Sequence, residues 1–439
     1  MHPKYQAYSL KTIFKNEKVS RALSADQKFA IEVVGRVLPF KVDNYVIDEL
    51  IDWSNIPDDP IFQLTFSQRG MLSDRQFNLV ADALRRGETD DRMTLLVNLI
   101  RRELNPHPAG QMEHNIPVIN GHELRGMQHK YRETVLFFPA RGQTCHSYCS
   151  FCFRWPQFVG IDELKFAMEE TAELVDYIRA HPYITDLLIT GGDPLVMSGE
   201  VLRAYLLPVI SSGIEHLINI RIGTKALGYW PYRFTTDKDA DALIRLFDEI
   251  MARGFHLSVM AHFTHPAELR TDAVRKAIAR IRNTGAQIRT QSPILRRIND
   301  SAEIWTDMWK EQIRQGCIPY YMFITRDTGP QDYFALPLEK ALRIYQSSCA
   351  QLSGVAKTAR GPVMSANHGK IEILGVADSP GGKIFILKFL QSRNPEWLHQ
   401  PFFAQFDDQA IWFDSLTPAF GAQQFFFEET KVTTVVGSI

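Results

Sequence analysis

A chain of 439 residues is too long for one minimal domain, so one large domain with additions at each end is the natural expectation. Apolar residues make up 45% of the chain and charged residues 23%, which allows a real hydrophobic core. The 49 basic and 50 acidic side chains give a net charge of −1. This balance gives no electrostatic reason to expect a nucleic acid or a membrane as a partner.

The beginning of the chain lacks the apolar core of a secretory signal. No window approaches the roughly 18 consecutive apolar residues that a membrane span requires. Of the five cysteines, three fall within eight positions. An odd and clustered set of cysteines suits reduced thiols that bind a metal better than a disulfide framework. We therefore expect a cytoplasmic protein.

Residues 1–125 are predicted to form a helical N-terminal region. Apolar residues recur at helical spacing in Asp26–Val37, Phe77–Arg86 and Asp91–Leu104, with Pro and Gly between these segments. No chemical motif occurs in this region. The pattern therefore favours a helical collar or an oligomerisation arm, which leaves a homo-oligomer as an open alternative.

Residues 126–350 alternate between short β-rich runs and amphipathic helices. The runs are Thr134–Pro139, Thr185–Thr190, Leu217–Ile222, His256–His262, Gln287–Gln291 and Pro319–Thr325. Thr271 and Asp300 stand where helix N-caps are expected. Six such units predict a parallel sheet, which right-handed crossovers would curl into a partial (β/α)6 barrel. In barrels of this kind the chemistry lies at the carboxyl ends of the strands, and the motifs described below fall there.

Residues 351–439 are β-rich and aromatic. Two strand-like runs flank Ser379-Pro380-Gly381-Gly382, which predicts a hairpin. The later run QPFFAQFDDQAIWFDSLTPAF is expected to form a lid or an edge over the open side of the barrel. The predicted fold is thus an α/β partial barrel with a helical N-terminal extension and a β-rich C-terminal extension.

Cys145, Cys149 and Cys152 have the spacing C-x3-C-x2-C directly after the first predicted strand. Thiolates suit zinc or iron–sulfur clusters. A closed zinc site needs four ligands, usually in two pairs, whereas Cys317 and Cys349 stand alone. Three cysteines on a cubane leave one iron open to a small molecule, unlike the four-cysteine electron carriers. We expect a [4Fe-4S] cluster, and a non-enzymatic iron–sulfur or zinc-binding protein is the minor alternative.

The second predicted strand is followed by Thr190-Gly191-Gly192-Asp193-Pro194. Two glycines let the backbone approach a ligand closely, and Asp193 and the free carbonyl groups can accept from an ammonium group. A plain turn between a strand and a helix could use the same residues. The motif therefore indicates a binding site only because it lies one strand after the cysteine loop.

The cysteine spacing, with Phe151 before the last cysteine, is similar to the signature of the radical S-adenosylmethionine (SAM) superfamily. The segments HKYRETVLF, TGGDPLVMS, IRIGTK, HFTHPAELR, TQSPILRRIND and IPYYMF follow one another as in the lysine 2,3-aminomutase family. The chain resembles this family over about residues 125–325. The resemblance implies a partial barrel of the radical SAM type and an enzyme that cleaves SAM to a 5′-deoxyadenosyl radical.

The resemblance also implies roles for individual residues. The three cysteines of the loop would bind three irons, and SAM would bind the fourth. The residues implied near SAM are Phe151, Gly191, Gly192, Asp193, Arg221 and Gln291. Arg154 would bind a substrate carboxylate, with a structural ion pair as the competing interpretation. The implied reaction is a 1,2-amino shift on an amino acid, and a flavodoxin or ferredoxin would supply the electron.

The family also uses pyridoxal phosphate (PLP), and here the sequence departs from the family's pattern. Arg360 stands where the family's imine-forming lysine is expected, and a guanidinium group cannot form an imine. Lys383, in a Gly-Gly-Lys context, is the candidate replacement, with Lys130 and Tyr131 near the phosphate. We expect PLP to bind weakly or not at all.

The substrate side of the family's pattern is altered as well. The family's aspartate for the distal ammonium group of the substrate aligns with Arg326, and Asp327 stands one residue later as a candidate substrate-binding residue. This change puts lysine in doubt as the substrate. A PLP-independent radical SAM enzyme that acts on a different small polar molecule is therefore the leading alternative.

Overall fold

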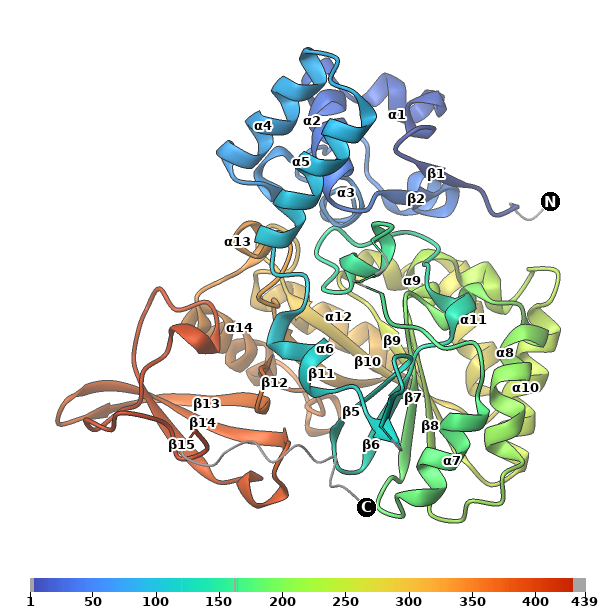
Figure 1. Ribbon diagram of the computed structural model, residues 1–439, viewed down its shortest axis with the longest axis vertical. Coiled ribbons are helices and arrows are strands. Elements are labelled where there is room, and N and C mark those ends of the chain that lie inside the picture. Colours follow the sequence, from blue (N-terminus) through green and yellow to red (C-terminus); the bar gives the residue numbers. More distant parts are fainter. Residues whose placement is uncertain (1–3, 120, 162, 164, 429–439) are drawn as a thin grey trace.

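The computed structural model of the protein describes residues 4–119, 121–161, 163 and 165–428 (Figure 1). The largest element within these residues is a sheet of eleven strands, which lie in the order β15-β14-β13-β12-β11-β10-β9-β8-β7-β6-β5. The middle strands β6 to β11 lie side by side in chain order and run parallel. The strands are β5 (Met127–Tyr131), β6 (Thr134–Phe137), β7 (Asp186–Ile189), β8 (Asn219–Thr224), β9 (His256–His262), β10 (Gln287–Ile294), β11 (Ile318–Ile324), β12 (Arg360–Ser365), β13 (Gly369–Ser379), β14 (Gly382–Ser392) and β15 (Pro401–Gln405).

The six predicted β-rich runs correspond to the six parallel strands β6 to β11. Strand β9 has the predicted bounds, whereas β8 begins two residues later than predicted and extends further toward its carboxyl end. In β8 the side chains of Ile220, Ile222 and Thr224 are buried, and Arg221 and Gly223, which alternate with them, are only half-buried. This alternation separates a helix-covered face of the sheet from a face that carries polar side chains.

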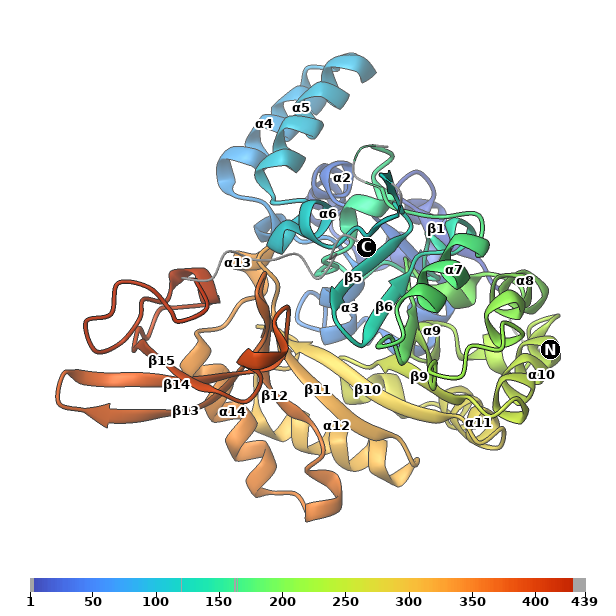
Figure 2. The ribbon, with the colours of Figure 1, turned by 60° about the horizontal axis from the view of Figure 1, so that its bottom comes forward.

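Helices follow the parallel strands and cover the outer face of the sheet (Figures 1 and 2). The Thr271 hydroxyl accepts a hydrogen bond from the Val274 backbone N–H at 3.3 Å, so Thr271 caps its helix as predicted. Asp300, the other predicted cap, does not cap its helix, because the Ser301 hydroxyl accepts from the Ile304 N–H instead. The covering helices are α7 (Ala172–Ala180), α8 (Gly199–Ile210), α10 (Ala240–Ala252), α11 (Asp272–Arg282), α12 (Ala302–Arg314) and α14 (Leu338–Ala350).

The C-terminal strands continue the central sheet instead of forming a separate one. Strand β12 pairs in parallel with β11, and β13, β14 and β15 follow in antiparallel order. The predicted hairpin is present, because Ser379 at the end of β13 pairs with Gly382 at the start of β14. The predicted edge segment supplies β15. Residues 429–439 of the predicted C-terminal region lie outside the described residues.

The predicted N-terminal helices correspond to α2, α4 and α5, with ends that differ by up to three residues. The N-terminal region also contains two short antiparallel strand pairs, which the sequence did not predict. Strand β1 (Ala7–Ser9) pairs with β2 (Lys41–Asp43), and β3 (Val118–Ile119) pairs with β4 (His122–Glu123). The main helices are α1 (Glu17–Ala22), α2 (Ala25–Val37), α3 (Pro60–Thr65), α4 (Asp74–Arg85), α5 (Asp90–Glu103) and α6 (Gln111–His114). In the part of the chain that the structure describes, no helix has the length and apolarity needed to cross a membrane.

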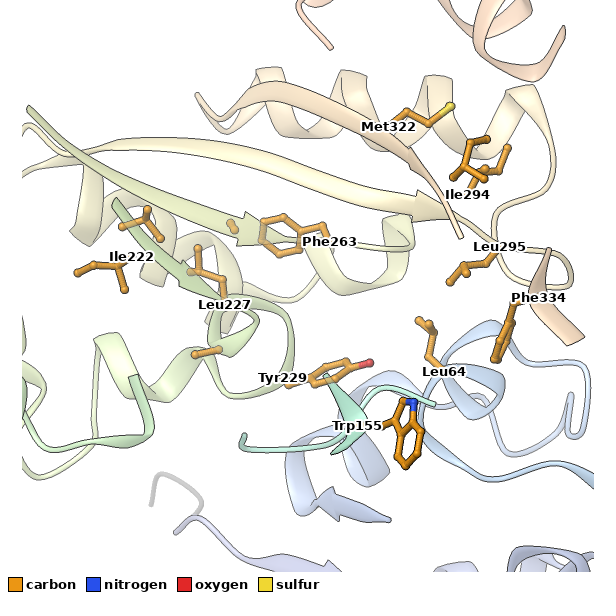
Figure 3. Close-up of a cluster of buried hydrophobic side chains, with 14 of the residues drawn as sticks. Leu64, Trp155, Ile222, Leu227, Tyr229, Phe263, Ile294, Leu295, Met322 and Phe334 are labelled. Carbon is orange, nitrogen blue, oxygen red and sulfur yellow. The ribbon is translucent and has the colours of Figure 1, made fainter. Parts of the chain in front are cut away.

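A buried cluster joins the N-terminal helices to the central sheet. Figure 3 shows three members of this cluster: Leu64 from α3, Trp155 from the segment after the cysteines, and Tyr229 from α9 (Ala226–Tyr229). The Trp155 side chain is almost fully buried, and its Nε1–H donates a hydrogen bond to the Thr328 hydroxyl at 3.0 Å. The segment that follows the cysteines is therefore anchored between helices from the N-terminal region and the end of the parallel strands.

Candidate active site around the cysteine loop

The cysteine loop, residues 144–155, follows β6 at the carboxyl end of the parallel strands. Cys145, Cys149 and Cys152 are free thiols and half-buried. Burial raises the pKa of the Cys149 thiol to about 12 and that of the Cys152 thiol to about 11. The thiols therefore hold their protons in the free protein, and a bound metal would have to displace them.

The donor set of the loop fits an iron–sulfur cluster. Among the described residues, no three His, Cys, Asp or Glu side chains are grouped to hold a single metal ion. A closed zinc site gathers four ligands around one ion, whereas each thiolate on a cubane binds a different iron. Cys317 is buried at the start of β11, and Cys349 lies in the last turn of α14, so neither belongs to the loop. The three thiolates therefore suit a [4Fe-4S] cluster with one open iron.

The glycine turn after β7 packs directly against the cysteine loop. A Cβ atom on Gly192 would lie 2.3 Å from the Thr144 carbonyl oxygen, and one on Gly191 would lie 2.5 Å from Gln143 Nε2. The Asp193 backbone N–H donates to the Thr144 carbonyl at 2.6 Å. At Gly192 only glycine allows this approach, because a Cβ atom there would overlap the backbone of Thr144 and push the two segments apart. The predicted approach of the two glycines to a ligand stays a prediction.

The Asp193 carboxylate is fully buried and occupied by donors from the chain itself. Its Oδ1 accepts from the Leu195 N–H at 2.9 Å, and its Oδ2 accepts from the Lys225 N–H at 2.9 Å. The Thr224 hydroxyl lies 2.8 Å from both oxygens. Asp193 thus joins the ends of β7 and β8. An ammonium group from SAM would have to share the carboxylate with these donors.

Of the residues predicted to bind SAM, Phe151 and Gln291 both lie near His262, whereas Arg221 lies apart from them. Phe151 contacts His262 edge to face at 5.5 Å between ring centroids, and His262 pairs with Gln291 across β9 and β10. His262 Nε2 is buried without a hydrogen-bond partner in the described structure. These residues lie at the carboxyl ends of the strands, beside the loop.

Arg221 lies away from this group. Its neighbours across the sheet, Ser258 and Gln287, stand four residues before His262 and Gln291, which is about 13 Å along the strands. The Arg221 guanidinium is paired with the Asp186 carboxylate, with Nε donating to Oδ1 at 2.8 Å. The predicted contact between Arg221 and SAM would require this ion pair to open or to be shared.

The N-terminal region holds the cysteine loop in place, and sequence reasoning missed the residues that do so. The Lys41 ammonium group donates to the Cys145 carbonyl at 2.7 Å, and the Ser147 hydroxyl donates to the Asp43 carboxylate at 2.6 Å. The Tyr5 hydroxyl donates to the His146 carbonyl at 2.7 Å. No local motif marks these residues. The N-terminal region thus contacts the cysteine loop through these hydrogen bonds, and its interpretation as a collar or an oligomerisation arm stays a prediction.

A buried ion pair lies beside Cys149. The Lys225 ammonium group donates to the Glu268 carboxylate at 2.5 Å and stands 4.3 Å from the centroid of the Tyr229 ring. The Cys149 thiol lies 3.6 Å from the Tyr229 hydroxyl. Lys225 belongs to the IRIGTK segment, but sequence reasoning did not assign it a role. This pair places an ammonium group next to the loop together with its carboxylate partner.

Two guanidinium groups lie on the other side of the loop. Arg154 packs against the rings of Phe138 and Phe153, at 4.6 and 4.9 Å, and Arg326 lies 5.4 Å from the Phe153 ring centroid. Among the described residues Arg154 makes no ion pair, and its Nη1 is buried without a hydrogen-bond partner. The choice between a substrate carboxylate and a structural ion pair as the partner of Arg154 stays a prediction. Asp327 lies next to this pair, with Oδ1 3.5 Å from Arg326 Nε.

Comparisons with known proteins bear on the family of the chain. No protein-family model matches it. A protein of Aquifex aeolicus (strain VF5), provisionally named an L-lysine 2,3-aminomutase, is 34% identical over 296 residues, which cover 67% of this chain and 75% of that protein. The chain belongs to the lysine 2,3-aminomutase family.

Other relatives are more distant. The L-lysine 2,3-aminomutase of Haemophilus influenzae is 26% identical over 70% of this chain and 86% of its own length. The L-lysine 2,3-aminomutase of Clostridium subterminale is 27% identical, and the match spans about half of each protein, 52% of this chain and 51% of the relative. The structure of Streptococcus suis SuiB bound to S-adenosylmethionine is 12% identical over 62% of this chain and 56% of that one, with a TM-score of 0.36. A likeness this low does not bear on function.

Of the residues predicted for the family's PLP site, Lys130 and Tyr131 lie together and Lys383 lies apart from them. Lys383 is exposed at the hairpin end of β14, whereas Lys130 and Tyr131 lie on β5. Two amines lie beside the Tyr131 ring, those of Lys130 and Lys370, each with its Nζ 5.4 Å from the ring centroid. Lys370 pairs with Gln391, eight residues beyond Lys383 and about 26 Å along the strand.

Arg360, at the family's lysine position, is exposed and lines a pocket of about 260 Å³. The other described residues that line it are Tyr131, Glu133, Tyr320, Tyr321, Leu390, Gln391, Ser392, Pro395 and Leu398, so no lysine faces this pocket. Lys370 donates to Gln391 Oε1 at 2.6 Å, and Lys130 donates to the Ala366 carbonyl. The chain thus keeps the family's cysteine loop and glycine turn but does not assemble a PLP site of the family's kind.

We predict that Gly192→Ala disturbs the cysteine loop. The added methyl group would overlap the Thr144 carbonyl, and overpacking of this kind costs about 1–3 kcal/mol. The variant should melt at a lower temperature and bind less iron per chain after anaerobic reconstitution. Gly375→Ala is the matched control, because a Cβ atom there meets nothing within 4 Å. Equal iron content and melting temperature in both variants would show that the turn and the loop are not packed together.

Proposed function

We propose that the protein is a radical SAM enzyme in which Cys145, Cys149 and Cys152 hold a [4Fe-4S] cluster and SAM binds the fourth iron. The supporting observation is that one loop presents three half-buried free thiols beside the glycine turn of the neighbouring parallel strand. In this proposal β6 to β11 and their helices form a partial (β/α)6 barrel of the radical SAM type. A helical region (1–125) and a β-rich region (351–439) flank it.

The residues of the chain would bind SAM and keep water away from it. Gly191 and Gly192 bring backbone groups close to the loop, and Phe151 would lie near the adenine, beside Gln291. When bound, the cluster supplies the electron that cleaves SAM to a 5′-deoxyadenosyl radical. Trp155 at the end of the loop is buried, and buried Phe334 contacts the Phe151 ring at 6.3 Å between centroids. A dry site protects a radical from side reactions.

The proposed reaction is an aminomutase-like 1,2-amino shift on an amino acid, which rests on membership of the family. An electron donor such as a flavodoxin or ferredoxin would reduce the cluster. The alternative is a PLP-independent radical SAM enzyme on a different small polar molecule, and the exposed position of Lys383 and Arg360 favours it. A non-enzymatic iron–sulfur or zinc-binding protein is disfavoured, because neither Cys317 nor Cys349 completes a four-cysteine site.

The cluster is tested by replacing each cysteine of the loop. Anaerobically reconstituted protein should bind about four irons and four sulfides per chain and convert SAM to 5′-deoxyadenosine when dithionite is added. Cys145→Ala, Cys149→Ala and Cys152→Ala should each reduce 5′-deoxyadenosine formation to background, because each removes one ligand. Iron and sulfide assays and chromatography of the products measure the outcome.

Cys317→Ala and Cys349→Ala are the matched controls, because both thiols lie outside the loop. Both variants should keep the cluster and the cleavage of SAM. Stoichiometric zinc without iron or sulfide in protein purified without oxygen would rule out the proposed cluster.

The use of PLP is tested by trapping an imine. The protein is incubated with PLP, reduced with borohydride, and mapped by peptide mass spectrometry. We expect no stoichiometric pyridoxyl adduct, because Arg360 replaces the family's lysine and Lys383 lies about 26 Å from Lys370 along β14. A stoichiometric adduct on Lys383 would contradict this expectation.

The same experiment examines Lys370, one of two amines that lie 5.4 Å from the centroid of the Tyr131 ring. Burial lowers the pKa of Lys370 to about 7, so a large fraction of this amine is neutral at physiological pH. A stoichiometric adduct on Lys370 that disappears in Lys370→Arg would restore PLP use with a new lysine. Exposed lysines provide the internal control for non-specific labelling.

A further inference from the structure

The sulfur of Cys149 has a hydrogen-bond partner that lies outside the cysteine loop. Its Sγ is 3.6 Å from the hydroxyl oxygen of Tyr229, the last residue of α9. Among the described residues, no other side chain makes a hydrogen bond to a sulfur of the loop, and the Tyr229 hydroxyl has no other hydrogen-bond partner. The contact therefore joins one of the three thiols to the segment that follows β8.

The packing around Tyr229, which is labelled in Figure 3, holds its ring beside the loop. The side chain is almost fully buried, and its backbone N–H donates to the Lys225 carbonyl at 3.0 Å. The preceding residue, Gly228, packs against Glu268, because a Cβ atom there would lie 3.3 Å from Glu268 Oε1. A ring packed in this way has little room to move away from Cys149.

The Lys225 ammonium group, which stands 4.3 Å from the centroid of the Tyr229 ring, has other partners. It donates to the Glu268 carboxylate at 2.5 Å. It also donates to the His262 carbonyl and to the Thr264 hydroxyl, both at 3.2 Å. These three bonds use all three N–H donors of an ammonium group. Of the two polar groups next to Cys149, only the Tyr229 hydroxyl is thus available to the sulfur.

The direction of this hydrogen bond depends on the state of the Cys149 sulfur. In the free protein the thiol is a weak donor, and it donates to the hydroxyl oxygen. A cysteine that binds a metal does so as the thiolate, which has no proton to donate. A phenol keeps its proton at neutral pH, and its O–H can rotate toward an acceptor. In the loaded protein Tyr229 would therefore be the donor and the sulfur the acceptor.

A donor at a ligand sulfur does not act equally on the two redox states of a cluster. Reduction adds one electron, and part of the added negative charge lies on the sulfur atoms. A hydrogen bond to the more negative state is the stronger one, so it stabilises the reduced cluster more than the oxidised cluster. Hydrogen bonds to the sulfurs are accordingly among the factors that set the reduction potential of an iron–sulfur cluster.

We propose that Tyr229 donates a hydrogen bond to the Cys149 sulfur and thereby raises the reduction potential of the [4Fe-4S] cluster. This inference rests on the proposed function, because it requires the cluster. Tyr229 would bind neither iron nor SAM, and its effect reaches the cluster through Cys149. The hydroxyl would make the cluster easier to reduce by an external electron donor.

The proposal is tested with Tyr229→Phe, which removes the hydroxyl and keeps the ring. The variant and the unchanged protein are reconstituted anaerobically, and the midpoint potential is measured without SAM by a redox titration followed by electron paramagnetic resonance. Loss of one hydrogen bond should lower the equilibrium constant for reduction about 3- to 10-fold. For one electron this is a shift of about 30 to 60 mV toward more negative potential.

Replacement of Tyr229 by 3-fluorotyrosine provides a second variant in case Tyr229→Phe does not take up the cluster. Fluorine makes the hydroxyl more acidic and therefore a stronger donor, while the ring changes little in size. The midpoint potential should then move in the opposite direction, to a less negative value. A role of Tyr229 in packing alone would not produce this shift.

Tyr177→Phe is the matched control, because Tyr177 is equally buried and its hydroxyl lies 2.6 Å from His129 Nδ1 instead of a loop sulfur. Its midpoint potential should equal that of the unchanged protein. An unchanged potential in loaded Tyr229→Phe, or a 3-fluorotyrosine variant without the opposite shift, would overturn the proposal. Failure of the unchanged protein to bind iron and sulfide would instead contradict the proposed function, so the two failures are distinguishable.

Discussion

The hydrogen bonds that hold the cysteine loop are the constraint on which the rest of the site depends. A loop that carries three free thiols has no regular secondary structure to satisfy its backbone, so other parts of the chain must do so. Lys41 donates to the Cys145 carbonyl, the Ser150 N–H donates to the Leu64 carbonyl, and the Asp193 N–H donates to the Thr144 carbonyl. The N-terminal region and the glycine turn therefore fix the loop from two sides before any ligand arrives.

The strands and the cysteine motif were predictable from the sequence because their signals are local. A parallel strand that is covered by helices consists largely of buried β-formers, and three closely spaced cysteines carry their chemistry in a few residues. The residues that hold the loop gave no such signal. Tyr5 and His146 are 141 positions apart, and Lys41 and Cys145 are 104 apart, so only the folded chain shows that they meet.

The candidate PLP lysine shows a different limit of sequence reasoning. The Gly-Gly-Lys context of Lys383 is typical of a turn, and the structure has a turn there. The pairing of β13 with β12 decides which end of the long hairpin lies against the rest of the sheet. No local sequence pattern predicts this pairing. That pairing places Lys370, at the start of β13, beside Tyr131 and Tyr321, and carries Lys383 to the exposed end.

The charges inside the molecule divide the interior into a balanced part and an unbalanced part. Lys225 is paired with Glu268 and Arg221 with Asp186, so these cations are neutralised by the chain. Arg326 is paired with Asp327 and lies near Asp414, whereas Arg154 makes no ion pair among the described residues. A lysine can relieve an unfavourable potential by releasing its proton, but a guanidinium group stays charged at any physiological pH. Arg154 therefore stays charged next to the cysteine loop. At Arg326 the chain supplies a counter-charge of its own, so this departure from the family changes the charge pattern just after β11 without leaving that cation unpaired.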